Sequence, residues 1–213
     1  MTLSRRRVLA ALATAGGAGV VTGSGTAALL YDEERLTAAV DVGAVDLAVA
    51  YEVTAGPNAG ETGRANGPTL TLPVADLTEA NDSGRALLTV SLPDLAEAVN
   101  NPAAVWLRLD CPPASALSES LSIRLSYADC ETGARGDTIA DGSLRSVADA
   151  LRNGHLLDAD PQTGSVDCLT DELCLLVEYW LDEAYVGQDT TALSFGIHGI
   201  QCRNDDTRAN PFP

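Results

Sequence analysis

Apolar and polar residues alternate along most of the chain beyond residue 35. Because successive side chains of a β-strand point to opposite faces of a sheet, an alternation with period two predicts half-buried strands. Eight stretches have this pattern: residues 36–42, 45–53, 70–74, 86–92, 105–109, 121–127, 173–181 and 191–197. The alternate positions of the sixth stretch are so polar that we expect this face of the strand to meet solvent.

One helix interrupts this series of strands. Ser143 is a favourable N-cap and Gly154 ends the segment that follows. Between them, a helix over residues 144–152 would place four apolar side chains on one face: Leu144, Val147, Ala148 and Leu151. Residues 56–68, rich in Gly, Pro and Asn, predict a loop, and residues 204–213 form a polar tail. We therefore predict an all-β fold, an antiparallel β-sandwich that is jelly-roll-like, with about eight strands and one short helix.

Residues 1–28 have the organisation of an export signal. Three arginines precede a weakly apolar stretch over residues 8–21, and small residues follow at a Thr26-x-Ala28 site. Arg5 and Arg6, followed by apolar positions, fit the twin-arginine pattern, and a general secretory signal is the alternative. The apolar stretch is shorter than the roughly 20 residues of a membrane span, and an uncleaved N-terminal anchor is the competing interpretation.

Several short motifs stand in the same order as in a known family. They are Gly25-Thr26-x-Ala28-Leu29-Leu30-x-Asp32, a strand–glycine–strand pattern over residues 40–49, Trp180, and Phe195 followed by Gln201-Cys202-Arg203-Asn204. In these features the chain resembles the TasA/camelysin family of exported fibre proteins, and its haloarchaeal members in particular. It departs from the bacterial pattern, because no aromatic residue stands at positions 27, 29 or 30.

The resemblance implies a function for the segment that follows the leader. It implies cleavage after Ala28 by a dedicated signal peptidase, which makes Leu29 the first residue of the mature chain. Residues 29–42 would then be a strand donated to the next subunit of a filament, and residues 43–203 would be the sandwich that accepts a strand. The side chains that would fill alternate pockets are Leu36, Ala38, Val40 and Val42. The alternative is that this strand pairs within its own subunit.

The charge of the chain excludes some classes of partner. The sequence contains 13 arginines, no lysine and 30 acidic residues, for a net charge of −17. Removal of the leader, which holds three arginines and no acid, makes the mature charge about −20. Such a surface repels nucleic acid and anionic membranes, so we expect neither as a partner of the mature chain. An acidic, lysine-free composition instead suggests a folded protein that works in concentrated salt.

All five cysteines lie beyond the leader, at positions 111, 130, 168, 174 and 202. In an oxidising compartment we expect two disulfides and one free thiol. If residues 173–181 and 191–197 formed a hairpin, Cys168 would lie beside Cys202, so this is the first predicted pair. The second predicted pair is Cys111–Cys130, which leaves Cys174 unpaired in the middle of an apolar strand.

The sequence gives little support for catalysis. The two histidines, His155 and His198, do not form the H-E-x-x-H motif of zinc proteases, and no Gly-x-Ser-x-Gly turn is present. A structural zinc site could be made from Cys168, Cys174, His198 and Cys202, but disulfides are the favoured interpretation. The acids Asp158, Asp160 and Asp167, or residues 204–206, lack the spacing of a calcium loop. We therefore assign no catalytic, cofactor or metal residue.

Three functional hypotheses remain open. The favoured one is a non-enzymatic structural subunit of an extracellular or cell-surface filament, such as a pilus or biofilm matrix fibre, whose partner is a second copy bound head to tail. The second is a monomeric, secreted or surface-attached sandwich with a binding role. The third, a camelysin-like metalloprotease, lacks recognisable ligands in the sequence.

Overall fold

The computed structural model describes residues 45–66, 68–79, 81–93, 100–161, 163, 165–181, 190–202 and 210–212. Contacts between Cα atoms divide the chain into Met1–Asp41 and Val42–Pro213, and the described residues all belong to the second unit. Its strands are β1 (Ala48–Ala55), β2 (Thr62–Asn66), β3 (Thr69–Val74), β4 (Ser83–Ser91), β5 (Ala103–Leu109), β6 (Leu121–Ala128), β7 (Arg135–Ser143), β8 (His155–Leu157), β9 (Glu172–Leu181) and β10 (Thr191–Gln201).

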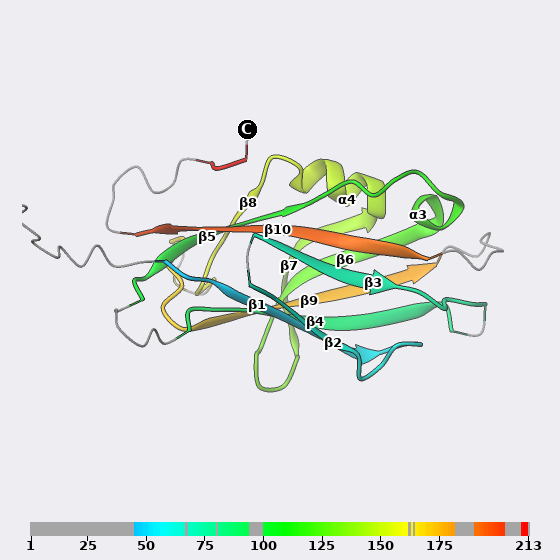
Figure 1. The fold of residues 1–213 in the computed structure, drawn as a ribbon, viewed down its shortest axis with the longest axis horizontal. Coiled ribbons are helices and arrows are strands. Elements are labelled where there is room, and N and C mark those ends of the chain that lie inside the picture. The colour runs from blue at the N-terminus through cyan, green and yellow to red at the C-terminus, as the bar shows by residue number, and fades with distance from the viewer. Residues whose placement is uncertain are drawn as a thin grey trace, which may run out of the picture. The chain divides into compact units, whose positions relative to one another are not determined.

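The described strands form two antiparallel sheets (Figure 1). The first, sheet A, has the order β2-β1-β4-β9-β6-β7, and the second, sheet B, has the order β3-β10-β5-β8. With β2 and β7 set aside as hairpin partners of β1 and β6, each successive strand lies in the other sheet. The predicted all-β sandwich is confirmed, with ten described strands instead of about eight.

Alternate residues of the strands form the core between the two sheets. In β9 the core side chains are Leu173, Leu175, Val177, Tyr179 and Leu181, and in β10 they are Leu193, Phe195 and Ile197. This is the alternation that the sequence predicts, although the outward-facing Cys174 and Leu176 of β9 are buried as well.

Helix α4 (Leu144–Leu151) packs its apolar face on the core, as predicted. The Ser143 hydroxyl accepts a hydrogen bond from the Ser146 backbone N–H at 3.3 Å, which caps the first turn. A second helix, α3 (Ala116–Ser120), was not predicted because it has only five residues; Ser115 and Ser118 cap each other's backbone N–H groups at its start.

Three described strands are not predicted by the sequence, because they lack a continuous apolar pattern. β2 lies inside the stretch predicted to be a loop. It is a strand because it pairs with β1, in a register that places Ala48 opposite Asn66 and Glu52 opposite Thr62. β7 is polar and largely exposed, and β8 has only three residues. In each case pairing with a stronger neighbouring strand overrides weak local propensity.

The predicted hairpin between the last two strands is wrong. β9 belongs to sheet A, between β4 and β6, whereas β10 belongs to sheet B, between β3 and β5. Both strands have apolar core faces, so periodicity alone could not tell that they lie in opposite layers of the sandwich.

One predicted disulfide is confirmed, although not for the reason that predicted it. Cys168 and Cys202 are bonded, with their Cα atoms 6.6 Å apart. They meet beside the start of β5: the Leu169 N–H donates to the Ala103 carbonyl at 2.8 Å, and the Cys202 N–H donates to the Pro102 carbonyl at 2.9 Å. β5, and not a β9–β10 hairpin, therefore brings the two cysteines together.

The second predicted disulfide, Cys111–Cys130, is wrong. Cys130 is bonded to Cys174, with Cα atoms 5.2 Å apart, and Cys111 is an exposed free thiol. Cys174 lies on the outer face of β9, opposite Ala128 of β6, and Cys130 follows two residues later in the turn between β6 and β7. Cys111 follows β5, which belongs to the other sheet.

Part of the polar C-terminal tail packs against the sandwich. The Arg108 guanidinium carbon lies 4.9 Å from the centre of the Phe212 ring, and His198 meets the same ring edge to face at 6.4 Å. The Asn210 side chain donates to the backbone carbonyl of Asn153. Within the predicted polar tail, residues 210–212 therefore pack on part of the outer face of sheet B.

Candidate strand-acceptor site

Strands at the edges of a sheet have unpaired backbone groups that can pair with another chain. The edges of the two described sheets are β2, β7, β3 and β8. β2 carries Arg64, and β7 carries Arg135, Asp137 and Asp141. β8 is only three residues long, which leaves β3, with the sequence Thr-Leu-Thr-Leu-Pro-Val, as the one long uncharged edge in the described part of the chain.

The register of β3 shows which of its backbone groups are available. The Ile197 N–H donates to the Pro68 carbonyl at 2.7 Å, and Phe195 pairs with Leu70 further along the ladder. Hydrogen-bonded pairs alternate in an antiparallel ladder. The backbone groups of Leu70, Leu72 and Val74 are therefore directed toward β10, and those of Thr69, Thr71 and Pro73 are directed toward the open edge.

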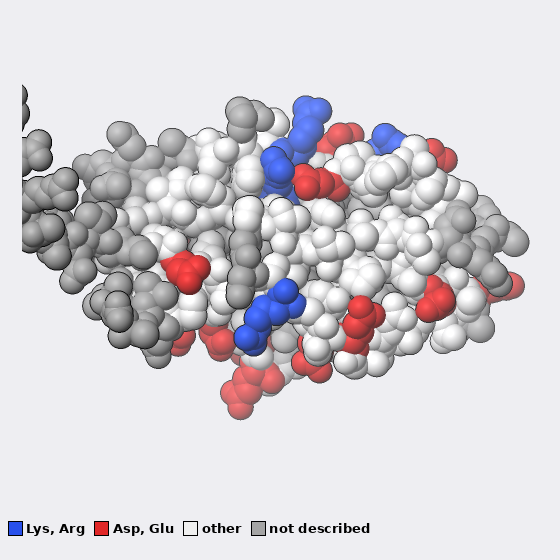
Figure 2. Space-filling view, viewed as in Figure 1, with Lys and Arg blue, Asp and Glu red and all other residues white. Residues whose placement is uncertain are grey.

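This edge has features that favour pairing with another strand and one feature, a proline, that limits such pairing. Thr69 and Thr71 offer a backbone donor and a backbone acceptor each, whereas Pro73 has no N–H and offers only its carbonyl. The Thr69 and Thr71 side chains are exposed. Uncharged side chains cover the surface over β3 (Figure 2), so an incoming apolar strand would meet little charge there even though the whole chain is strongly acidic.

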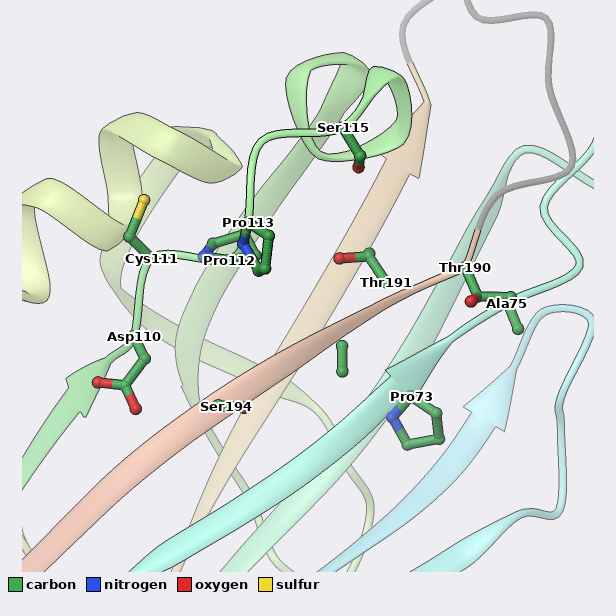
Figure 3. Close-up of a pocket in the computed structure, with 11 residues that line it drawn as sticks. Pro73, Ala75, Asp110, Cys111, Pro112, Pro113, Ser115, Thr190, Thr191 and Ser194 are labelled. Atoms are coloured by element: carbon green, nitrogen blue, oxygen red, sulfur yellow. The ribbon is translucent and has the colours of Figure 1, made fainter.

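A cavity of about 700 Å³ adjoins the C-terminal end of β3. Its walls come from β3, from the start of β10 and from residues 110–115 after β5 (Figure 3). The apolar part of the lining consists of Pro73, Ala75, Pro112, Pro113 and Ala192. Asp110 and Cys111 also belong to the lining. The other lining residues are Ser115, Thr190, Thr191 and Ser194, so the side chains are short and leave room here for larger aliphatic groups from another chain.

The opposite end of the sandwich holds the segment that leads into β1. A Cβ atom on Gly199 would lie 2.7 Å from Leu47 Cδ1 and 3.0 Å from Val45 Cγ1, so both side chains pack directly on β10. The Asp46 carbonyl accepts from the Asn100 side chain at 2.9 Å, which fixes this segment. The chain therefore enters the sandwich at the Gly199 end of β10, while the cavity lies at its Thr191 end, about 27 Å away at roughly 3.4 Å per residue.

The residues predicted for export and strand donation lie outside the described residues. These are Arg5 and Arg6 of the twin-arginine pattern, Thr26, Ala28 and Leu29 at the cleavage site, and Leu36, Ala38, Val40 and Val42 of the donor strand. The acceptor edge was missed in the sequence, although a signal for it was present: a proline within an alternating run, as at Pro73, indicates an edge strand.

The alternative zinc site is not compatible with the disulfides. Cys168, Cys174 and Cys202 are all bonded to other cysteines, so none is a thiolate ligand. Within the described ranges, no group of three or more His, Cys, Asp or Glu side chains is arranged to hold a metal ion.

The acids considered for calcium have local hydrogen bonds. The Asp158 carboxylate accepts from the backbone N–H groups of Asp160 at 3.1 Å and Asp167 at 2.9 Å. These bonds hold together the loop between β8 and β9, as expected of Asp in turns.

No described helix is long and apolar enough to cross a membrane. Two disulfides are typical of proteins that fold in an oxidising, extracellular environment. Comparison of the chain with protein-family models, curated proteins and solved structures gives no match.

Proposed function

We propose that the mature chain is a structural, non-enzymatic subunit of an extracellular filament and that it polymerises by strand donation. In this proposal residues 29–42 of one copy pair with the open edge of β3 in the next copy. Val40 and its neighbours at alternate positions then fill the cavity at the end of β3. The observation that carries the proposal is the long uncharged edge of β3 in a chain of charge −17.

The positions of the two ends of the sandwich support a head-to-tail contact. The chain enters at the Gly199 end of β10, and the cavity lies at the Thr191 end. A donor attached at one end and an acceptor at the other make a heterologous contact, which propagates as a filament when its rotation does not close a ring. The proposed self-association is of this heterologous type, and the partner is a second copy of the chain.

Export accounts for the control of assembly. The leader and the Thr26-x-Ala28 site predict that a signal peptidase frees Leu29 outside the cytoplasm, so the donor strand becomes available only after export. The two disulfides agree with an extracellular or cell-surface location. The resemblance of the sequence motifs to those of TasA/camelysin fibre proteins points to the same function.

A charge on the acceptor edge tests the proposal. The backbone of Thr71 is directed toward the open edge and its side chain is exposed, so Thr71→Lys should leave the monomer folded but prevent pairing with an apolar strand. The matched control is Thr62→Lys on β2, an exposed position on another edge. Electron microscopy of the secreted protein should show filaments for wild type and Thr62→Lys and none for Thr71→Lys. Filaments of Thr71→Lys at normal abundance would refute strand addition at β3.

A further inference from the structure

The outer face of sheet A carries a row of charged side chains on four neighbouring strands. Arg85 of β4 pairs in register with Glu178 of β9, which pairs with Arg124 of β6, which pairs with Asp141 of β7. Arg85, Glu178 and Arg124 point away from the core, because the residues that alternate with them are buried. Asp141 lies on the same side, since it pairs in register with Arg124. The next row along the same face places Trp180 between Ser83 and Ser122.

A cavity of about 430 Å³ opens on this face. Its lining includes Arg85, Arg124, Glu178, Trp180 and Ser83. Ligand sites generally combine one aromatic or apolar surface with a few convergent polar groups, in cavities of about 300–1,000 Å³. The side chains here have that composition, and the row lies on the opposite sheet from the acceptor edge of β3.

Ion pairs hold the arginines around one carboxylate. Arg85 Nη2 lies 2.9 Å from Glu178 Oε1, and Arg135 Nη1 lies 3.2 Å from Glu178 Oε2. Burial acts to raise the pKa of Glu178, but the hydrogen bonds and charges of the two arginines outweigh it and lower the pKa. Glu178 is therefore ionised at neutral pH and orients both guanidinium groups.

The local charge is opposite in sign to that of the whole chain. Arg124 is held by Asp141, with Nη2 and Oδ2 2.7 Å apart. The ion pairs at the cavity thus join three guanidinium groups and two carboxylates, an excess of one positive charge in a protein of net charge −17. A guanidinium has five N–H donors, and the contact of Arg85 with Glu178 uses one of them. Donors thus remain for an anion, and an excess of one charge matches one carboxylate of a ligand.

Trp180 supplies the flat surface of the cavity. Its indole is partly exposed, and the Arg124 guanidinium carbon lies 5.5 Å from the ring centre. An aromatic face packs well against the C–H face of a pyranose ring, and hydroxyl groups such as that of Ser83 can donate to and accept from sugar hydroxyls. An acidic peptide would use the arginines but has less use for the indole and the serine.

We propose that this cavity binds an acidic saccharide, with a uronate carboxylate on Arg85 and Arg124 and the sugar ring against Trp180. The proposal does not depend on filament formation, because the site lies within one copy of the chain. It gives the protein a means to attach to carboxylated surface polysaccharide, either as a monomer or as a filament with one such site per subunit.

Calorimetric titration of the purified full chain in molar salt tests this site. The probes are oligogalacturonate, the neutral oligogalactose of equal length, and oligoglutamate. We expect binding of oligogalacturonate at least tenfold tighter than that of either other probe. Equal binding of neutral sugar would overturn the role of the arginines, and equal binding of oligoglutamate would overturn the saccharide assignment.

Variants separate binding from stability. Arg85→Gln and Trp180→Ala should each weaken oligogalacturonate binding at least tenfold, whereas Arg145→Gln on the exposed side of α4 should leave it unchanged. Glu178→Gln removes a negative charge from the cavity and should strengthen binding. If these ion pairs only stabilised the fold, the substitution would not strengthen binding. Each variant is compared at a temperature where its circular dichroism matches that of the wild type. Absence of binding by the folded wild type, or no effect of Arg85→Gln and Trp180→Ala, would overturn the proposal.

Discussion

Gly154 shows how a single residue permits the contact between the C-terminal segment and sheet B. It ends α4 with φ of +83°, and a Cβ atom there would lie 2.5 Å from Phe212 Cδ2. Glycine therefore satisfies a turn that most residues disfavour and also leaves room for the Phe212 ring. The sequence predicts the first function, because Gly commonly follows a helix, but not the second, which depends on a residue 58 positions away.

Alanine substitutions at two glycines separate these two effects. Gly154→Ala should destabilise the fold by about 1–2 kcal/mol from its positive φ, with a further loss from the clash with Phe212. Gly133→Ala is the matched control, because Gly133 has φ of +66° and nothing lies within 4 Å of its Cβ position. Denaturant titration in high salt should show the larger loss for Gly154→Ala. Equal losses would mean that Phe212 does not pack on this turn in solution.

Cysteine pairing gives a second test at the scale of residues. Cys130→Ser should cost about 2–4 kcal/mol, because it opens a disulfide and leaves the buried Cys174 unpaired. Cys111→Ser should change stability by about 0.5 kcal/mol or less, because Cys111 is exposed and free. Alkylation without denaturant should modify Cys111 alone. A peptide map that joins Cys111 to Cys130 would contradict the assignment.

At the scale of elements, the strands with an apolar face could be predicted and those without one could not. The alternation in β4, β5, β6, β9 and β10 is clear because their inner faces are buried, and α4 has a cap, an apolar face and a terminating glycine. The strand β2, with Gly63 and Arg64, has no such pattern and exists because β1 pairs with it. The pattern also could not predict which strands pair, because β9 and β10 follow one another in the chain but lie in different sheets.

The short strand β8 connects stability to pH through His155. Burial lowers the pKa of His155, because the imidazolium form loses hydration. The unfolded chain then takes up a proton at about pH 6.5, its ordinary value, before the folded chain does. Stability should therefore be unaffected by this group above about pH 7 and should fall as the pH drops below about 6.5.

Thermal unfolding between about pH 7.5 and 5.5 at constant high salt measures this effect. His155→Gln should show a smaller loss of melting temperature over that range than the wild type. If His155→Gln and wild type have the same slope, the imidazole of His155 is hydrated in the folded protein.

At the scale of the whole molecule, charge sets the conditions in which the sandwich is stable. The net charge is −17 and the acids far outnumber the arginines. Lowering salt from 1 M to 0.1 M lengthens the screening distance from about 3 Å to about 10 Å, so more pairs of acids repel each other. The melting temperature should fall as salt is lowered, and a melting temperature equal at the two concentrations would contradict this account.

In the proposed filament, residues 29–42 of one copy pair with β3 of the next. The sequence suggested the donor through a resemblance, and the structure suggests the acceptor through an uncharged edge and an adjoining cavity. Two variants each remove one side of this contact. Val40→Asp places a negative charge in a cavity lined by Asp110 and by no arginine, which costs several kcal/mol and disables the donor. Thr71→Lys disables the acceptor.

The most direct measurement is native mass spectrometry of the two mature variants, separately and mixed. Each variant alone should be monomeric. Every filament contact needs a functional donor strand and a functional acceptor edge, and each variant has only one of the two. An equimolar mixture should form one-to-one dimers and nothing longer, since the donor of Thr71→Lys fits the acceptor of Val40→Asp and no further contact is possible. Polymers of either variant alone, or a mixture that stays monomeric at concentrations where the wild type polymerises, would contradict strand donation to β3.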